Sequence, residues 1–396
     1  MKAFFASLVL TALAASGRHA PGVNPVAWPL GARVPSGLRP QTPDGPRLKD
    51  LMPPGLLIGA ALSGAQVDGR DAAAQAVVVR HFDTISPENL LKWTSTELEP
   101  GRFTFEAADR YVAFGQANGM AVIGHNLVWH QQTPRWAFEG KEGRPLDRET
   151  ALARLRAHIT AVAGRYKGRI HGWDVVNEAF ENDGSWRQTP WFKAIGPDYI
   201  AQAFTFAHEA DPQAELYYND FDLYLPAKRK AVLALVRDLR AKGVRVDAVG
   251  EQGHWSLEKP AAAEIEAILD DIAGAGVKAM ITELDVDVLP RTPEMEHADA
   301  ARKAEWLKTT NLYPAGLPDA QQEQLARRYA EVFGLLLKHR SQLTRVTFWG
   351  VTDAQSWLNG FPIPGRTNYP LLWDRQARGK PALQAVIDVL KAVPPR

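Results

Sequence analysis

Short apolar runs alternate with longer amphipathic segments along most of this chain. An apolar run without polar alternation is typical of a strand in a parallel sheet that is covered on both faces. We therefore expect strands at Leu56–Gly59, Thr84–Ser86, Ala121–Gly124, Ile170–Val176, Leu216–Asn219, Ala248–Gly250, Ala279–Thr282 and Thr347–Trp349. Helices are expected between them, for example at Arg148–Tyr166, Pro197–Ala210, Pro226–Lys242, Ala261–Gly274 and Asp319–His339.

Repeated strand–helix units indicate an α/β protein with a parallel sheet. A doubly wound sheet usually carries a glycine-rich phosphate turn, and the sequence has none of that form. Eight units within residues 48–396 instead fit a (β/α)8 TIM barrel, built as a single domain with insertions.

The first 47 residues do not share this pattern. Lys2 precedes an apolar run at residues 4–15 that small residues follow, as a secretory signal requires. A membrane anchor would need about 20 apolar residues, and Arg18 ends this run earlier. We predict a signal peptide at residues 1–20, a Pro- and Gly-rich leader at 21–47, and a secreted protein that is either periplasmic or extracellular.

Charge and composition narrow the possible partners. The chain has 46 Lys and Arg against 45 Asp and Glu, without a basic cluster that could follow a phosphate backbone. Nucleic acid is therefore not an expected partner, nor is a membrane once the signal is removed. The lack of Cys excludes thiolate metal sites and a Cys nucleophile, and no metal-type His spacing occurs at a strand end. We expect no metal, no cofactor and a monomer.

Polar side chains follow the apolar runs, at the edge of a barrel where chemistry usually collects. Glu178 follows the fourth run and Glu283 the seventh. Since these strands are not neighbours, the two carboxylates should face each other across the barrel mouth. Glycosidic cleavage needs such a pair, one acid for the leaving oxygen and one carboxylate for the anomeric carbon. A single Glu after a strand is more often a solvated loop residue, so the pattern alone leaves the glycosidase interpretation open.

The sequence around these strand ends resembles glycoside hydrolase family 10, which includes bacterial and fungal endo-β-1,4-xylanases. The likeness covers about residues 50–390 and keeps the order and spacing of the family. The matching segments are Ser86–Asn89 with Lys92 and Trp93, Gly124–His130 with Thr133 and Pro134, Trp173–Ala179, Asn219–Asp220, Gly250 with Gln252 and His254, Ile281–Asp285, and Trp349–Gly350 with Ser356 and Trp357. The resemblance implies a retaining endo-1,4-β-xylanase on a (β/α)8 barrel, with xylan or xylo-oligosaccharides as substrate.

The resemblance also implies roles for single residues. Glu178 matches the general acid/base of the family and Glu283 its nucleophile. Asn177 resembles the Asn that hydrogen-bonds the sugar 2-hydroxyl in the −1 subsite, while His254 and Asp285 resemble the pair that orients the nucleophile. Further substrate contacts are implied at the −2 subsite for Glu88, Asn89 and Lys92, and around the −1 subsite for His130, Gln252, Trp349 and Trp357.

Some of these positions also have structural explanations. A core role stays an alternative to sugar contact for Trp349 and Trp357. Glu97 and Glu181 are expected to be solvated surface charges. Structure is at least as good an explanation as sugar contact at three further positions, His125, Trp129 and Trp136.

The sequence departs from the family pattern on the leaving-group side. Phe221 and Asp222 stand where the family usually has Tyr and Asn, which removes a hydroxyl and adds a charge. Glu251 stands where an apolar residue is common, and it would shift the pKa of the acid if it reached the cleft. The polar segment 291–318 is either a lid or a surface insertion.

Two other functions stay open at this point. A β-1,4-glucanase or mixed glucanase/xylanase on the same barrel would use identical chemistry and differ only in tolerating a 6-hydroxymethyl group. Bulky rings of Trp349 and Trp357 over the −1 subsite would leave little room at C5, which favours xylose. A non-catalytic carbohydrate-binding barrel predicts the loss of one carboxylate, and both are present.

Overall fold

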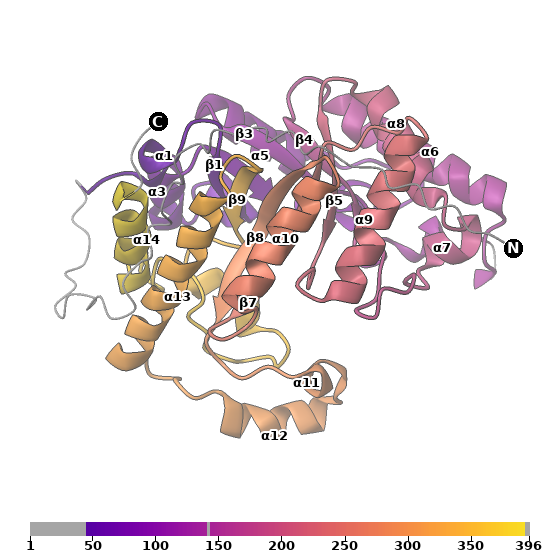
Figure 1. The fold of residues 1–396 in the computed structure, drawn as a ribbon. Helices are drawn as coiled ribbons and strands as arrows, with labels where there is room; N and C mark the ends of the chain where they lie inside the picture. Colours follow the sequence, from indigo (N-terminus) through magenta and orange to yellow (C-terminus); the bar gives the residue numbers. More distant parts are fainter. Residues whose placement is uncertain (1–44, 141–142, 393–396) are drawn as a thin grey trace, which may run out of the picture. The chain divides into compact units, whose positions relative to one another are not determined.

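The computed structural model describes residues 45–140 and 143–392. The predicted signal peptide and nearly all of the predicted leader lie outside the described residues, so both stay predictions. Within the described residues, eight parallel strands close into a barrel, and helices connect them on the outside (Figure 1). The expected (β/α)8 TIM barrel is confirmed.

The barrel strands overlap all eight predicted runs. They are β1 (Leu57–Leu62), β2 (Thr84–Pro87), β3 (Ala121–Val128), β4 (Gly172–Asn177), β5 (Glu215–Asp220), β6 (Ala248–Glu251), β8 (Lys278–Asp287) and β9 (Leu343–Phe348). Neighbours in this order are paired in parallel, β6 pairs with β8, and β9 pairs with β1 to close the barrel. A short additional strand, β7 (His254–Ser256), pairs with the far end of β8. That pairing explains why β8 continues to Asp287, whereas the prediction ended it near Glu283.

The outer helices also follow the predicted pattern. One long helix follows each barrel strand: α3 (Ala72–His81), α5 (Glu106–Ala117), α6 (Arg148–Arg165), α8 (Tyr199–Ala210), α9 (Pro226–Ala241), α10 (Ala262–Gly274), α13 (Asp319–Lys338) and α14 (Pro381–Ala392). The additional helices are α1 (Leu48–Leu51), α2 (Gly64–Val67), α4 (Trp93–Thr96), η1 (Arg135–Ala137), α7 (Pro190–Ile195), α11 (Pro293–His297), α12 (Ala300–Thr310), η3 (Asp353–Gln355) and η4 (Trp357–Asn359). In the described part of the chain, no helix combines the length and the apolar character that crossing a membrane requires.

Local sequence signals account for these helices. In α13, Leu325, Tyr329, Val332 and Leu336 are buried at three- and four-residue spacing, which places one apolar stripe against the barrel. Helix α6 begins after Asp147, whose carboxylate accepts a hydrogen bond from the backbone N–H of Thr150 at 2.8 Å. This cap satisfies one of the backbone donors that every helix start leaves free.

Glycines in the barrel strands make room for large rings on neighbouring strands. A Cβ atom on Gly124 of β3 would lie 2.1 Å from the Trp173 ring of β4. A Cβ atom on Gly172 of β4 would lie 2.2 Å from the hydroxyl of Tyr217 in β5. The close packing of the barrel therefore depends on the missing side chains at these two positions.

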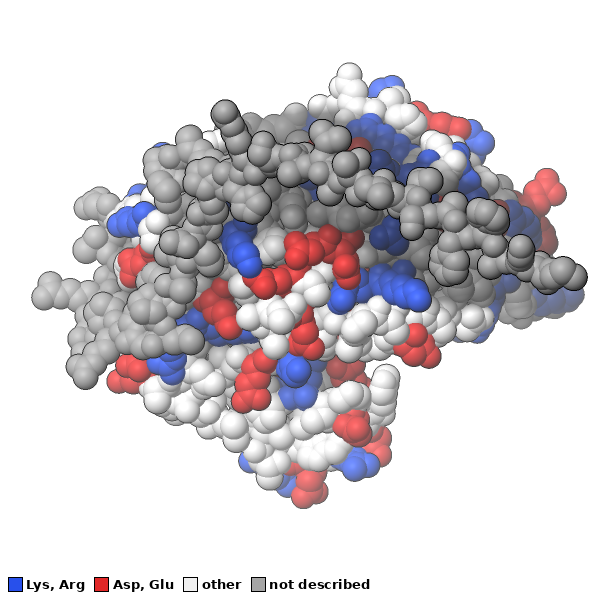
Figure 2. Space-filling model, viewed as in Figure 1, with Lys and Arg blue, Asp and Glu red and all other residues white. Residues whose placement is uncertain are grey.

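The segment 291–318 forms α11 and α12, which lie at the lower edge of the view in Figure 1. It is attached to the connection between β9 and α14. Asn311 accepts a hydrogen bond from the backbone of Thr367 at 2.9 Å, and the Tyr369 hydroxyl donates to the carbonyl of Tyr313 at 2.7 Å. The segment is thus a helical insertion tied to the loop region that also carries Trp357. Across the described surface visible in Figure 2, acidic and basic side chains are interspersed.

The glycine packing leads to a stability prediction. Gly124→Ala should lower the free energy of unfolding by about 1–3 kcal/mol, because the added methyl group overpacks the Trp173 ring. Gly334→Ala is the matched control: Gly334 lies within α13 and has nothing within 4 Å of an added Cβ. It should gain up to about 1 kcal/mol from the higher helix propensity of Ala. Urea unfolding measures both, and shifts of equal sign would contradict the packing explanation.

Candidate active site

Glu178 lies directly after β4, and its backbone turns sharply out of the strand. Its φ of +58° is in the left-handed region, and its N–H donates to the carbonyl of Asn219 in β5 at 2.9 Å. A non-glycine residue held in this region costs free energy and is most often found at functional sites. The side chain is 8 % exposed. Its Oε1 accepts hydrogen bonds from Asn177 at 3.1 Å and Gln252 at 3.0 Å, and its Oε2 accepts one from the Trp129 indole at 3.0 Å.

Glu283 lies inside β8 and is 5 % exposed. Its Oε1 accepts a hydrogen bond from the Asn219 amide at 2.8 Å. Its Oε2 lies 3.2 Å from Nε2 of His254. Both carboxylate oxygens therefore have a fixed nitrogen partner, one neutral and one a histidine ring.

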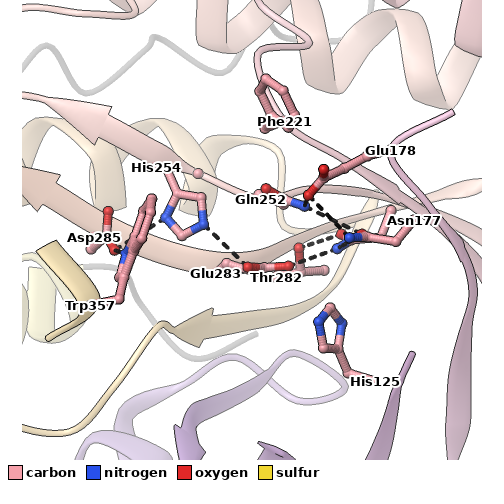
Figure 3. Close-up of polar contacts among 12 residues, drawn as sticks. His125, Asn177, Glu178, Phe221, Gln252, His254, Thr282, Glu283, Asp285 and Trp357 are labelled. Atoms are coloured by element: carbon pink, nitrogen blue, oxygen red, sulfur yellow. Dashed lines mark hydrogen bonds and ion pairs between the residues drawn. The ribbon is translucent and has the colours of Figure 1, made fainter. Parts of the chain in front are cut away.

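Asn219 joins the two carboxylates into one hydrogen-bond network. Figure 3 labels Asn177, Glu178 and Glu283, the three residues that it connects. Its amide nitrogen donates to Glu283 and also to Oδ1 of Asn177 at 2.9 Å, and Asn177 in turn donates to Glu178. Its amide oxygen accepts from the hydroxyl of Thr282 at 2.6 Å, which fixes the orientation of the amide. The two glutamates come from β4 and β8, which are not neighbours in the barrel, as the sequence predicts.

His254 places a positive charge beside Glu283. Its Nε2 faces Glu283, and its Nδ1 lies 3.1 Å from Asp285, which also accepts a hydrogen bond from the Trp357 indole at 2.7 Å. Burial disfavours the charged imidazolium, but Asp285 and Glu283 outweigh it and raise the pKa of His254 to about 10. Burial opposes ionisation of Glu283 as well, yet its hydrogen bond from His254 and nearby positive charges hold its pKa below the ordinary value.

The group predicted for the −2 subsite gathers beside this network. The ammonium of Lys92 lies 3.3 Å from the amide oxygen of Asn89 and 4.8 Å from the centre of the Trp129 ring. Burial lowers the pKa of Lys92, and Glu283, Glu88 and Glu178 act in the opposite direction. Burial likewise raises the pKa of Glu88. This cation is thus held among the carboxylates of the site.

Aromatic rings pack around the histidine side of the network. The ring centre of Trp357 lies 4.8 Å from that of His254. Trp349 packs edge-on against two histidines, with its ring centre 6.3 Å from that of His254 and 5.2 Å from that of His125. His130 contacts Trp129 edge-on at 5.8 Å, and burial lowers its pKa to about 4.

The structure contradicts the expected surface position of Glu97 and confirms that of Glu181. Glu97 was expected to be a solvated charge, and this is wrong: it is 5 % exposed and lies 2.8 Å from His158 in the interior. The largely polar sequence around Glu97, residues 94–100, does not reveal that a histidine from α6 reaches it. Glu181 does lie on the surface, with Arg187 at 3.3 Å. Trp136 donates to the carbonyl of Leu98 at 2.8 Å, which is a structural contact.

Asn219, Thr282 and Trp129 take part in the network although the sequence analysis assigned them no catalytic or binding role. Each stood in or beside a segment that matched the family at a strand end, which was the available signal. Their hydrogen-bond partners come from other strands, so the chain order could not identify them. His125 pairs instead with a residue outside this network, because its Nδ1 lies 2.9 Å from Asp174. Among the described residues, no group of three or more His, Asp and Glu side chains is arranged to hold a metal ion.

Comparison with known proteins places this arrangement in a family. The sequence profile of Glycosyl hydrolase family 10 matches residues 48–389. The chain is 42 % identical over 342 residues to endo-1,4-beta-xylanase A of Xylanibacter ruminicola, which covers 86 % of this chain and 93 % of the relative.

Solved structures agree with the sequence match. A GH10 endoxylanase retrieved from a sugarcane soil metagenome superposes with a TM-score of 0.80 at 42 % identity, covering 87 % of this chain and 99 % of that one. An intracellular xylanase of Thermoanaerobacterium saccharolyticum, solved as a mutant in complex with xylotriose, superposes with a TM-score of 0.75 at 33 % identity, covering 87 % and 99 %. The chain therefore belongs to glycosyl hydrolase family 10.

Proposed function

We propose that this protein is a retaining endo-1,4-β-xylanase that hydrolyses internal β-1,4-xylosidic bonds of xylan. The observation that carries the proposal is the network that joins Glu178 and Glu283 while giving them different partners. Glu283 faces the His254 imidazolium, which favours an ionised nucleophile. The three hydrogen-bond donors to Glu178 are neutral amide and indole groups, so no histidine cation is bonded to this carboxyl group.

The reaction follows from these positions in two displacements. In the first, a Glu283 oxygen attacks the anomeric carbon, the bond to the leaving oxygen breaks, and Glu178 transfers its proton to that oxygen. In the second, Glu178 as carboxylate takes a proton from water, the water oxygen attacks the same carbon, and the bond to Glu283 breaks. Asn177 donates to Glu178 and accepts from Asn219, which also donates to Glu283, and these contacts support a hydrogen bond from Asn177 to the sugar 2-hydroxyl. Two inversions return the original configuration.

Several observations support xylan as the substrate. The curated relatives carry the name endo-1,4-beta-xylanase, and one structural neighbour binds xylotriose. Trp349 and Trp357 pack against His254, the partner of Glu283, so their rings restrict the space around the reacting sugar. A xylose unit lacks the 6-hydroxymethyl group that would need that space, which disfavours the glucanase alternative.

The first prediction concerns the nucleophile. A 2-deoxy-2-fluoro xylobioside with a good leaving group should form a stable ester with Glu283, because the fluorine slows breakdown of the intermediate. The corresponding 2-fluoro cellobioside is the control for sugar preference and should label much more slowly. Peptide mapping by mass spectrometry locates the ester. A label on another carboxylate would overturn the assignment, and faster labelling by the cellobioside would favour a glucanase.

The second prediction concerns the acid/base. Glu178→Ala should cleave an aryl xylobioside with a good leaving group in a burst, since that phenol needs no proton, while hydrolysis of the intermediate becomes slow. Xylan should hardly be cleaved. Added azide needs no general base, so it should restore turnover and yield the β-configured glycosyl azide. Glu181→Ala, which removes a surface carboxylate three residues away, is the control and should keep normal turnover.

An α-configured azide product, or a folded Glu178→Ala protein without rescue, would refute the retaining acid/base assignment.

The third prediction concerns His254. His254→Ala should reduce kcat by about 10- to 100-fold, as is usual when a residue that orients a reacting group is lost. It also removes the cation that holds down the pKa of Glu283, so the acidic limb of the kcat/KM profile should move to higher pH. His158→Ala, which removes a buried histidine paired with Glu97, is the control and should reduce stability without moving this limb. An unmoved limb in His254→Ala would contradict the electrostatic role.

A further inference from the structure

A buried carboxylate behind the leaving-group side of the site has no role in the mechanism above. Glu251 ends β6 and is 1 % exposed. Its Oε2 accepts a hydrogen bond from the backbone N–H of Leu223 at 2.7 Å. Its Oε1 accepts from the backbone N–H of Gly253 at 3.1 Å and from the Trp255 indole at 3.3 Å. One carboxylate thus satisfies three donors from two separate segments of the chain.

The first of these segments is the turn after β5, residues 221–223. The N–H of Glu178 is bonded to Asn219, two residues before this turn. Figure 3 shows the Phe221 ring on the Glu178 side of the network, away from Glu283. Asp222 has φ +57°, a left-handed conformation that a non-glycine residue keeps only when its surroundings hold it there. The bond from Leu223 to Glu251 is one such restraint.

The second segment carries Gln252 and His254, the residues directly after and three after Glu251. Gln252 donates to Glu178, and His254 faces Glu283. The bond between Glu251 and the N–H of Gly253 fixes the backbone between them. Glu251 is therefore placed to hold the leaving-group turn in register with the side chains that contact both carboxylates.

The charges around Glu251 come from several elements. Burial and the negative charge of Asp222 raise its pKa to about 7, against the two backbone donors and the Lys228 ammonium of α9. Lys228 is itself paired with Asp220 at 2.8 Å and lies 3.5 Å from the centre of the Phe221 ring. Tyr224 follows the turn, and its own pKa is raised by burial and by Asp222 and Glu251.

We propose that Glu251 is a positioning residue whose ionised carboxylate holds the turn of residues 221–223, and with it Phe221, as a fixed wall for the sugars beyond the scissile bond. The inference rests on the proposed retaining function, because it assigns that wall to the leaving-group side of the same cleft. The substrate class it concerns is the aglycone xylose units of an oligosaccharide, not the sugars held on the other side of the scissile bond.

The direction of the pH effect follows from the donors. The ionised carboxylate accepts from all three N–H groups, whereas a protonated carboxyl turns one oxygen into a donor that faces another N–H. The raised pKa means that ionising Glu251 costs folding free energy: this part of the stability is fully present below pH 4.5, the ordinary value, and is lost as pH rises to about 7. The turn is fully held only above that pH, so aglycone sugars should bind more tightly there.

Transglycosylation isolates this effect from the chemistry. With an aryl xylobioside as donor and xylobiose as acceptor, the glycosyl-enzyme partitions between water and the acceptor, and only the acceptor occupies the leaving-group side. Glu178 serves as base in both branches, so its own titration cancels from the ratio. The measured quantity is xylotetraose formed per phenol released, in initial rates, from about pH 6 to about pH 8.

In the unaltered protein this ratio should rise with pH, with a midpoint near 7. Glu251→Gln has the same shape but offers an N–H group where an acceptor is needed. It should lower the ratio about threefold to tenfold at the high-pH end and remove its pH dependence. Glu97→Gln, another buried glutamate, is the matched control and should leave the ratio and its pH dependence unchanged.

Asp222→Asn tests the same idea with Glu251 intact, and keeps the test valid if Glu251→Gln does not fold. Removing the negative charge of Asp222 should lower the pKa of Glu251 and move the midpoint of the ratio to lower pH. An unmoved midpoint, a ratio independent of pH in the unaltered protein, or a Glu251→Gln ratio equal to that of the unaltered protein would overturn the proposal. The lack of any transfer product in the unaltered protein would likewise overturn the proposal, whereas the lack of a 2-fluoro xylobiosyl ester on Glu283 would refute the retaining function instead.

Discussion

Two carboxylates buried at the mouth of an apolar barrel are costly to keep unless fixed donors replace the water they have lost. The Asn219 amide supplies the central part of that compensation. It donates to Glu283 and to Asn177, and Asn177 donates to Glu178, so one side chain from β5 sets the relative position of groups from β4 and β8. The remaining features of the site build on this arrangement.

The two glutamates differ in the charge of the groups that contact their carboxylates. His254 holds a positive charge between Glu283 and Asp285, and the Trp357 indole fixes Asp285 in turn. The surroundings of Glu178 supply neutral donors instead. The difference between the two glutamates comes from their partners and not from the depth of burial, because both glutamates are buried.

The turn of residues 221–223 after β5 is stabilised differently, by a buried carboxylate other than Glu178 and Glu283. Glu251 is held by backbone donors and by the Trp255 indole, and the turn that it contacts carries Phe221 and Asp222. These are the positions at which the sequence departs from the family pattern. In the structure Glu251 is hydrogen-bonded to the turn that carries Phe221 and Asp222, so the three departures belong to one connected group.

The sequence by itself determined the barrel, because eight buried apolar runs with helical segments between them leave few other folds. It also assigned the two glutamates to the correct strands, although Glu283 lies inside β8 and not at its end. It also indicated Asn177, Gln252 and His254 through short motifs. Only the tertiary structure decided which groups contact each other, because hydrogen bonds such as those of Asn219 join strands distant along the chain. The burial of Glu97 against His158 was missed for the same reason: charge and polarity are read locally along a sequence, whereas the partner that makes a buried charge stable comes from another element.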